Sequence, residues 1–191
     1  SFELLEKTLI SDKTQKLGEI IEYLASGATP KSGGEDYLEN GEHYFLRLVN
    51  FADDMSVDLT DSYFITADIY NGMLKRVQLE NGDILFGIAG SIGKMAIFEH
   101  NVKAVVNQAI AVIRVRHNVN SKFIAYYLNS IIVKKQIARL QRPVAQPNLN
   151  TEELKSLKIV LPELDKQNNI ANHIENIREQ AKSLKQQAID D

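Results

Sequence analysis

The stretch AIAVIRVRHNVNSKFIAYYLNSII, residues 109–132, decides the fold class of this chain. Its first eight residues alternate, with Ile110 and Val112 on one face and Ala111 between them on the other, which is the two-residue period of a strand. From Ser121 onward the apolar residues follow a period of 3.6, which is typical of an amphipathic helix. Ser121 also suits the N-cap of that helix. A strand followed directly by a helix favours a mixed domain.

Short apolar runs elsewhere carry strand patterns, separated by turn signals such as Asn71-Gly72 and Asn81-Gly82. We expect strands over residues 43–51, 74–79, 83–88, 95–98 and 104–116, and a last one over residues 157–161 after a short helix that starts at Thr151. Together these elements predict a single α+β domain of mixed short strands and helices over residues 16–161.

A different pattern follows Pro162. Apolar residues recur there at alternating spacings of four and three, at Ile170, Ile174, Ile177, Ala181, Leu184 and Ala188. This seam predicts a long coiled-coil helix over residues 162–191 that forms a dimer interface. The alternative is that the stripe docks on its own domain. A helix of about 25 residues runs about 38 Å, which favours a helical partner because a domain of this size has a radius of gyration of only about 15 Å.

The net charge of −3 hides a strong segregation of charge. Residues 1–69 hold 5 basic side chains against 14 acidic ones, whereas residues 70–150 hold 11 basic against 3 acidic. Between His100 and Asn150 there are 8 basic residues and no carboxylate. Such a field attracts polyanions, although a solvated basic face remains an equal alternative.

Composition excludes several classes of protein. A hydrophobic content of 44% with 25% charged residues is typical of a soluble globular protein. The chain has no cysteine, which excludes disulfide frameworks, thiolate catalysis and cysteine-based zinc sites. No apolar run is long enough to cross a bilayer, and the acidic N-terminus does not resemble a secretory signal. We therefore expect a cytoplasmic protein without a membrane partner.

The sequence shows no catalytic constellation. Gly87-Ile-Ala-Gly-Ser-Ile-Gly-Lys94 resembles a phosphate-binding loop superficially, but Gly87 lies one residue too early, Met95 replaces the Ser or Thr, and a strand is expected next. The histidines have no metal-ligand spacing. We therefore predict neither cofactor nor metal, and no enzymatic activity.

Polar side chains that can pair with base edges are frequent in the acid-poor region and near it. They are Arg47, Asn50, Asn107, Gln108, Arg114, Gln141, Arg142, Gln146 and Asn148. Each one alone is more often an ordinary surface residue, so the set as a whole carries the indication of DNA binding.

An ordered set of motifs resembles the recognition domain of type I restriction–modification specificity subunits. The set is Leu17-Gly-Glu-Ile20, Gly27-Ala-Thr-Pro-Lys31, Asn81-Gly-Asp-Ile-Leu85, Gly90-Ser-Ile-Gly-Lys94, Val106-Asn-Gln-Ala109, Phe123-Ile-Ala-Tyr-Tyr-Leu128 and Ile159-Val-Leu-Pro162. The family usually has a Glu-Gln pair where this chain has Lys166-Gln167. A usual member carries two recognition domains and two conserved helices, whereas this chain has one of each, so it looks like a half-length subunit or an excised half.

The resemblance implies a non-catalytic subunit that reads a bipartite double-stranded DNA site and holds methyltransferase subunits and restriction subunits. The residues expected to contact DNA are Thr29, Lys31, Ser32, Arg47, Ser91, Lys94, Gln108, Arg142, Gln146 and Asn148. Among them Lys31 and Lys94 are expected to anchor phosphates, and Arg47, Arg142 and Gln146 to read bases. The alternative function is a scaffold that does not bind DNA and assembles an enzyme complex through the helix.

Overall fold

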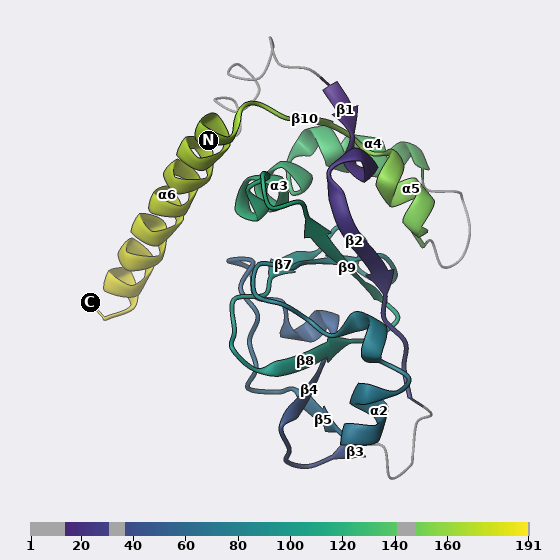
Figure 1. Ribbon diagram of the computed structural model, residues 1–191. Coiled ribbons are helices and arrows are strands. Elements are labelled where there is room, and N and C mark those ends of the chain that lie inside the picture. The colour runs from purple at the N-terminus through teal and green to yellow at the C-terminus, as the bar shows by residue number, and fades with distance from the viewer. Residues whose placement is uncertain (1–13, 31–36, 141–147, 191) are drawn as a thin grey trace.

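The computed structural model describes residues 14–30, 37–140 and 148–190. Figure 1 shows helices α3, α4 and α5 at the top, a central sheet beneath them, a second sheet at the bottom and one long helix, α6, to the side. This arrangement confirms the predicted α+β class with a long C-terminal helix. Within the described residues, no helix is long and apolar enough to cross a bilayer.

Two of the three sheets in the described residues have four strands each. The central sheet has the order β2 (Ile21–Ser26), β9 (Ile110–Val115), β6 (Ile84–Gly87) and β7 (Met95–Ile97), and all its neighbours are antiparallel. The second sheet has the order β3 (Tyr37–Leu38), β5 (Tyr63–Ile65), β4 (His43–Leu46) and β8 (Lys103–Val106), and its only parallel pair is β4 with β8.

Strand β9 is buried on both faces because it lies between two cores. Ala111 and Ile113 point into a core shared with the helices, whereas Ile110 and Val112 point into a core shared with the second sheet. All four are fully buried. The alternation in the sequence therefore separates two apolar cores, which is how a strand covered on both sides reads as a nearly continuous apolar run.

The expected helix from Ser121 to Ile132 is wrong in two respects. Its N-cap is Asn120, whose side chain accepts a hydrogen bond from the Phe123 amide at 2.8 Å. The helix also divides into α3 (Ser121–Leu128) and α4 (Ile131–Leu140). The break lets α3 bury all six residues from 123 to 128 while α4 buries only Val133 and Ile137.

Three other segments differ from expectation or complete the fold. The strand expected over residues 74–79 is instead the 3₁₀ helix η3 (Lys75–Val77), because Leu74 and Val77, three residues apart, both face the core. Helix α5 (Thr151–Ser156) and β10 (Lys158–Val160) form as predicted. The remaining short elements are β1 (Thr14–Lys16), which pairs with β10, η1 (Leu17–Glu19), η2 (Leu48–Asn50) and α2 (Ala67–Asn71).

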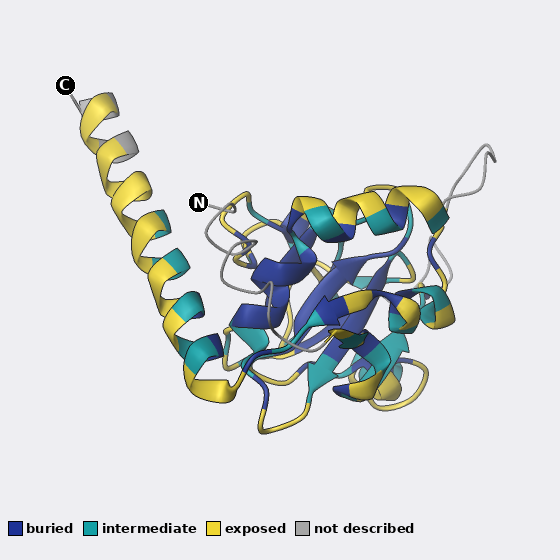
Figure 2. Cartoon of the chain, turned by 90° about the horizontal axis from the view of Figure 1, so that it is seen from above, coloured by how far each residue is buried: buried dark blue, intermediate teal, exposed yellow. Residues whose placement is uncertain are grey.

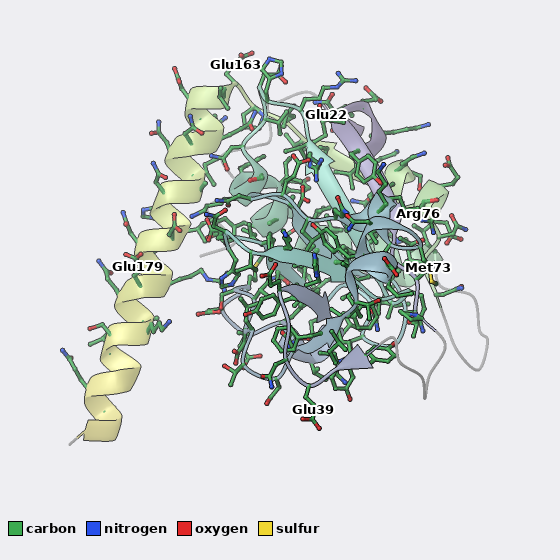
Figure 3. All side chains as sticks on the ribbon, turned by 60° about the horizontal axis from the view of Figure 1, so that its bottom comes forward. Glu22, Glu39, Met73, Arg76, Glu163 and Glu179 are labelled. Atoms are coloured by element: carbon green, nitrogen blue, oxygen red, sulfur yellow. The ribbon has the colours of Figure 1, made fainter. Side chains whose placement is uncertain are left out.

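Helix α6 (Leu164–Asp190) docks on α3 through its first half. Gln167, only 2% exposed, accepts a hydrogen bond from the Asn120 amide at 2.9 Å and donates one to the Pro162 carbonyl at 2.7 Å. Glu163 and Glu179 mark the course of this helix in Figure 3. The buried glutamine thus links the start of α6 to the start of α3.

Farther along, charged contacts hold α6 against the domain. Lys122 in α3 bridges Glu175 of α6 and Glu99, 3.0 Å away. Burial would lower the pKa of Lys122, but its bonds to Glu175 and Glu99 outweigh that effect and raise the pKa above its ordinary value. Arg178 donates to the Asp53 carbonyl at 3.4 Å and lies 5.5 Å from the ring of Tyr126. The helix therefore leaves the domain in one defined direction.

Candidate nucleic-acid interface

Four segments meet at the end of the central sheet where β9 begins. The Gly27 amide donates to the Ile110 carbonyl at 3.0 Å, and the Ile88 amide donates to the Ala109 carbonyl at 2.8 Å. Residue Ala89 in turn forms an antiparallel bridge with Asn148. These backbone bonds join the segments after β2, after β6, before β9 and before α5 into one surface. We call it the loop face and define it by Thr29, Ser91, Lys94, Gln108 and Asn148. Arg47 comes from a fifth segment, which meets this face where Lys94 Nζ donates to the carbonyl of the neighbouring Leu48.

The glycine-rich segment Gly90–Lys94 forms the tight hairpin tip of this face. Gly90 and Gly93 have φ angles of +71° and +84°, which glycine adopts without strain. The Gly87 amide donates to the Lys94 carbonyl at 2.7 Å, and β7 follows immediately. A hairpin, rather than a strand-to-helix turn, accounts for the departure of this segment from the phosphate-binding loop pattern.

The predicted DNA-contacting residues differ in how free their side chains are. Thr29, Ser91, Gln108 and Asn148 are exposed. Lys94 donates from Nζ to the Leu48 carbonyl at 3.1 Å, and Arg47 lies 3.8 Å above the ring of Tyr63. Lys31, Ser32, Arg142 and Gln146 lie outside the described residues. The exposed four are therefore available to a ligand as they stand, whereas Lys94 and Arg47 must leave internal partners.

Two other polar candidates have structural tasks instead. Asn50 is 2% exposed, accepts a hydrogen bond from the Arg47 amide at 2.8 Å and donates one to the Asp58 carbonyl at 3.1 Å. Arg114 forms two 2.8 Å bonds to the carboxylate of Asp83, which is buried. Asn and Arg side chains can pair with bases, but the side chains of Asn50 and Arg114 already form hydrogen bonds inside the domain.

The sequence did not predict that Val49 is exposed. This residue lies in η2 beside the loop face, and 69% of it is accessible to solvent. The run of residues 43–51 was expected to be one strand, in which Val49 would have been an ordinary core residue. Strand β4 instead ends at Leu46, and the 3₁₀ turn that follows carries Val49 outward. No local signal marks this turn in the sequence.

The absence of a side chain at Gly27 lets two segments of the loop face touch. A Cβ atom at this position would lie 2.2 Å from the carbonyl oxygens of both Val106 and Asn107. Since these are backbone atoms of the last residue of β8 and of the residue after it, they cannot turn aside as a flexible side chain can. The glycine of the Gly27–Lys31 motif is therefore required by the close approach of two backbones.

We expect Gly27→Ala to lower the free energy of unfolding by about 1–3 kcal/mol, because overpacking forces the backbone to shift. Gly41→Ala is the matched control, since its Cβ would meet the Phe64 side chain at 3.2 Å rather than backbone. Urea denaturation followed by circular dichroism measures both. A loss for Gly27→Ala no larger than that for Gly41→Ala would contradict the steric argument.

The heptad seam divides between two environments (Figure 2). Ile170 and Ile174 are half-buried and pack on the core of their own domain. Ile177, Ala181, Leu184 and Ala188 are exposed, with 65% of Leu184 accessible. The first part of the seam thus follows the alternative of docking on its own domain, and the last part remains without cover in this chain.

Within the described residues, no group of three His, Asp or Glu side chains could hold a metal ion.

A sequence-family profile described as the type I restriction modification DNA specificity domain matches residues 12–190. The chain belongs to this family. It is 30% identical over 169 residues to the putative type I restriction enzyme MjaX specificity subunit of Methanocaldococcus jannaschii, a match that covers 83% of this chain and 37% of that protein. It is also 26% identical over 145 residues to the EcoBI specificity subunit of Escherichia coli, covering 74% of this chain and 30% of that protein.

The fold has a counterpart among solved structures. A chain in a structure of a type I R-M system superimposes with a TM-score of 0.72 at 19% identity, covering 96% of this chain and 46% of that one. The chain therefore spans between about a third and a half of the length of these relatives.

Proposed function

We propose that this chain is the sequence-reading component of a type I restriction–modification system and binds double-stranded DNA through the loop face. The observation that carries the proposal is that exposed Thr29, Ser91, Gln108 and Asn148 come from four separate segments onto one surface of a specificity-family domain. Amide side chains such as Gln108 and Asn148 can pair with adenine in the major groove. Lys31 and Lys94 anchor phosphates, and Ser32, Arg47, Arg142 and Gln146 complete the contact set.

The chain directs other subunits rather than catalysing a reaction itself. Its relatives are named as specificity subunits of type I restriction enzymes, and this supports methyltransferase and restriction subunits as its partners. We place the assembly in the cytoplasm, where its DNA target lies. The division of labour is a recognition domain over residues 16–161 and a dimerising spacer helix over residues 162–191.

A homodimer would supply the second recognition domain. Relatives about two to three times as long support this view, because one copy of this chain matches only part of each. The exposed end of the seam, from Ile177 to Ala188, is the surface on which the second copy packs, and Ile170 and Ile174 fix the helix to its own domain.

The proposed function predicts a symmetric DNA target. Selection from random duplexes should yield two inverted copies of one short half-site around an unread spacer, because two-fold symmetry in a protein is mirrored in its operator. Helix α6 has 27 residues and runs about 40 Å, so the half-sites should lie roughly one helical turn of DNA apart. A non-palindromic bipartite site would instead indicate an excised half whose natural partner domain differs.

The selection, together with the salt dependence of binding, separates the DNA-reading function from a scaffold function. Binding through phosphates weakens steeply with salt, because counterions are released when the protein binds. A scaffold that assembles enzymes through α6 alone would enrich no sequence and show no such salt dependence.

A further inference from the structure

The fold pairs three of the eight basic residues between His100 and Asn150 with carboxylates. Lys103 pairs with Glu42 at 3.6 Å, Arg114 pairs with Asp83, and Lys122 pairs with Glu99. Each partner comes from an acidic part of the sequence or from a neighbouring loop. Within the described residues, Arg116, Lys134, Lys135 and Arg139 are exposed and have no carboxylate partner. Most of the positive charge of this segment is therefore left unpaired by the fold.

Helix α4 holds three of these unpaired cations. Within the described residues, Lys134, Lys135 and Arg139 have no carboxylate partner, and all three are exposed. Lys135 and Arg139 lie on the face opposite Val133 and Ile137, which are buried, and Lys134 lies on the flank between the two faces. Lys135 and Arg139 are four residues apart, so they follow one another about 6 Å apart along the helix axis.

Carboxylates on neighbouring elements are engaged elsewhere. In α5, Glu152 pairs with Lys155 at 2.8 Å and Glu153 accepts a hydrogen bond from the Asn150 amide at 2.9 Å. The macrodipole of α4 favours a cation in its last turn, which accounts for Arg139 but not for the two lysines in its middle. Like charges four residues apart also repel each other. The fold therefore keeps these cations on one helix although they repel each other.

Helix α4 packs against the loop face through its buried side. The Ile137 side chain would be 3.9 Å from a Cβ at Gly93, so α4 packs directly on the hairpin tip. The chain returns from the end of α4 to Asn148, which bridges Ala89. Arg116, also unpaired, lies at the opposite end of β9. The exposed cations of α4 therefore lie on a helix that packs against the hairpin tip of the loop face.

We propose that Lys134, Lys135 and Arg139 form a binding site for the DNA phosphate backbone, which holds the duplex across the end of the loop face without reading bases. This inference rests on the proposed DNA-reading function and extends it to a helix that carries none of the predicted contact residues. Exposed cations that follow one another along a helix and have no carboxylate partner can bind a polyanion with regularly spaced charges. Phosphate contacts of this kind position a protein on DNA but do not specify the sequence.

The test uses the full chain and two duplexes of equal length, one with the selected site and one without it. Fluorescence anisotropy measures the affinity of each from 50 to 200 mM salt. The triple variant Lys134→Gln, Lys135→Gln, Arg139→Gln should bind both duplexes more weakly by the same factor. The slope of log K against log salt should fall by about 0.9 per lost contact, or by between two and three in all. Glutamine keeps the helix propensity of the site.

Lys103→Gln is the matched control, because it removes an exposed cation that already has a carboxylate partner, and it should leave the slope unchanged. A triple variant with the slope of the unmodified chain, or one that loses only the selected duplex, would overturn the phosphate site while the DNA-reading function stands. If the unmodified chain binds neither duplex with a steep salt dependence, both proposals fall. Normal DNA binding with loss of a methyltransferase partner would identify the face as a protein-docking surface instead.

A conservative variant guards against misfolding as the cause. Lys134→Arg with Lys135→Arg retains both charges and should bind as the unmodified chain does. Equal thermal unfolding of the glutamine and arginine variants would show that a difference in affinity arises from charge.

Discussion

Replacing Arg114 with leucine is expected to lower the free energy of unfolding by about 3–5 kcal/mol. The Asp83 carboxylate is only 1% exposed and accepts hydrogen bonds from both Nε and Nη2 of Arg114 at 2.8 Å. It also accepts a hydrogen bond from the Glu80 amide at 2.8 Å. Without the guanidinium, a buried charge would remain with one backbone donor. Urea denaturation measures the loss.

Glu80→Gln provides the control for this prediction. Glu80 contacts the same guanidinium at 2.6 Å, but its side chain is 67% exposed, so its removal should cost less than about 1 kcal/mol. The bonds to Asp83 raise the pKa of Arg114 above its ordinary value, so the guanidinium keeps its charge. Removing both members, as Asp83→Leu with Arg114→Leu, should recover much of the loss. Equal losses for Arg114→Leu and Glu80→Gln would refute a buried ion pair.

The second large effect concerns assembly. Ile177→Asp with Leu184→Asp should convert a homodimer into a monomer, because each copy would then bury carboxylates without partners, at a cost of several kcal/mol. Each 1.4 kcal/mol weakens association about tenfold. Both positions are exposed in the single chain, so the recognition domain should keep its stability. Light scattering at tens of micromolar measures the mass.

Matched charges on the outer face of the same helix test whether the seam matters. Asn176→Asp with Ser183→Asp adds the same charge seven residues apart, at exposed positions one residue before the seam. This variant should remain dimeric. A monomeric unmodified protein, alone and with its partners, would refute the homodimer. Monomers from both variants would point to net charge rather than to the seam.

Elements whose signals lie within a few residues of one another could be predicted from the sequence. Alternation around Ile110 predicted the central strand, and spacings of four and three after Pro162 predicted the long helix. These patterns reflect backbone geometry within a few residues, which is why they can be read without a structure. The family resemblance rested on the same local motifs, and the family match over residues 12–190 confirms it.

Tertiary structure alone decided which residue meets which. Arg114 looked suited to a base edge until Asp83, 31 positions away, proved to hold it. The seam of α6 carries one pattern along its length, but only the half that reaches α3 finds an apolar surface, so Ile170 docks and Leu184 stays exposed. Periodicity states which residues share a face, whereas the partner of that face depends on distances in space that no local pattern encodes.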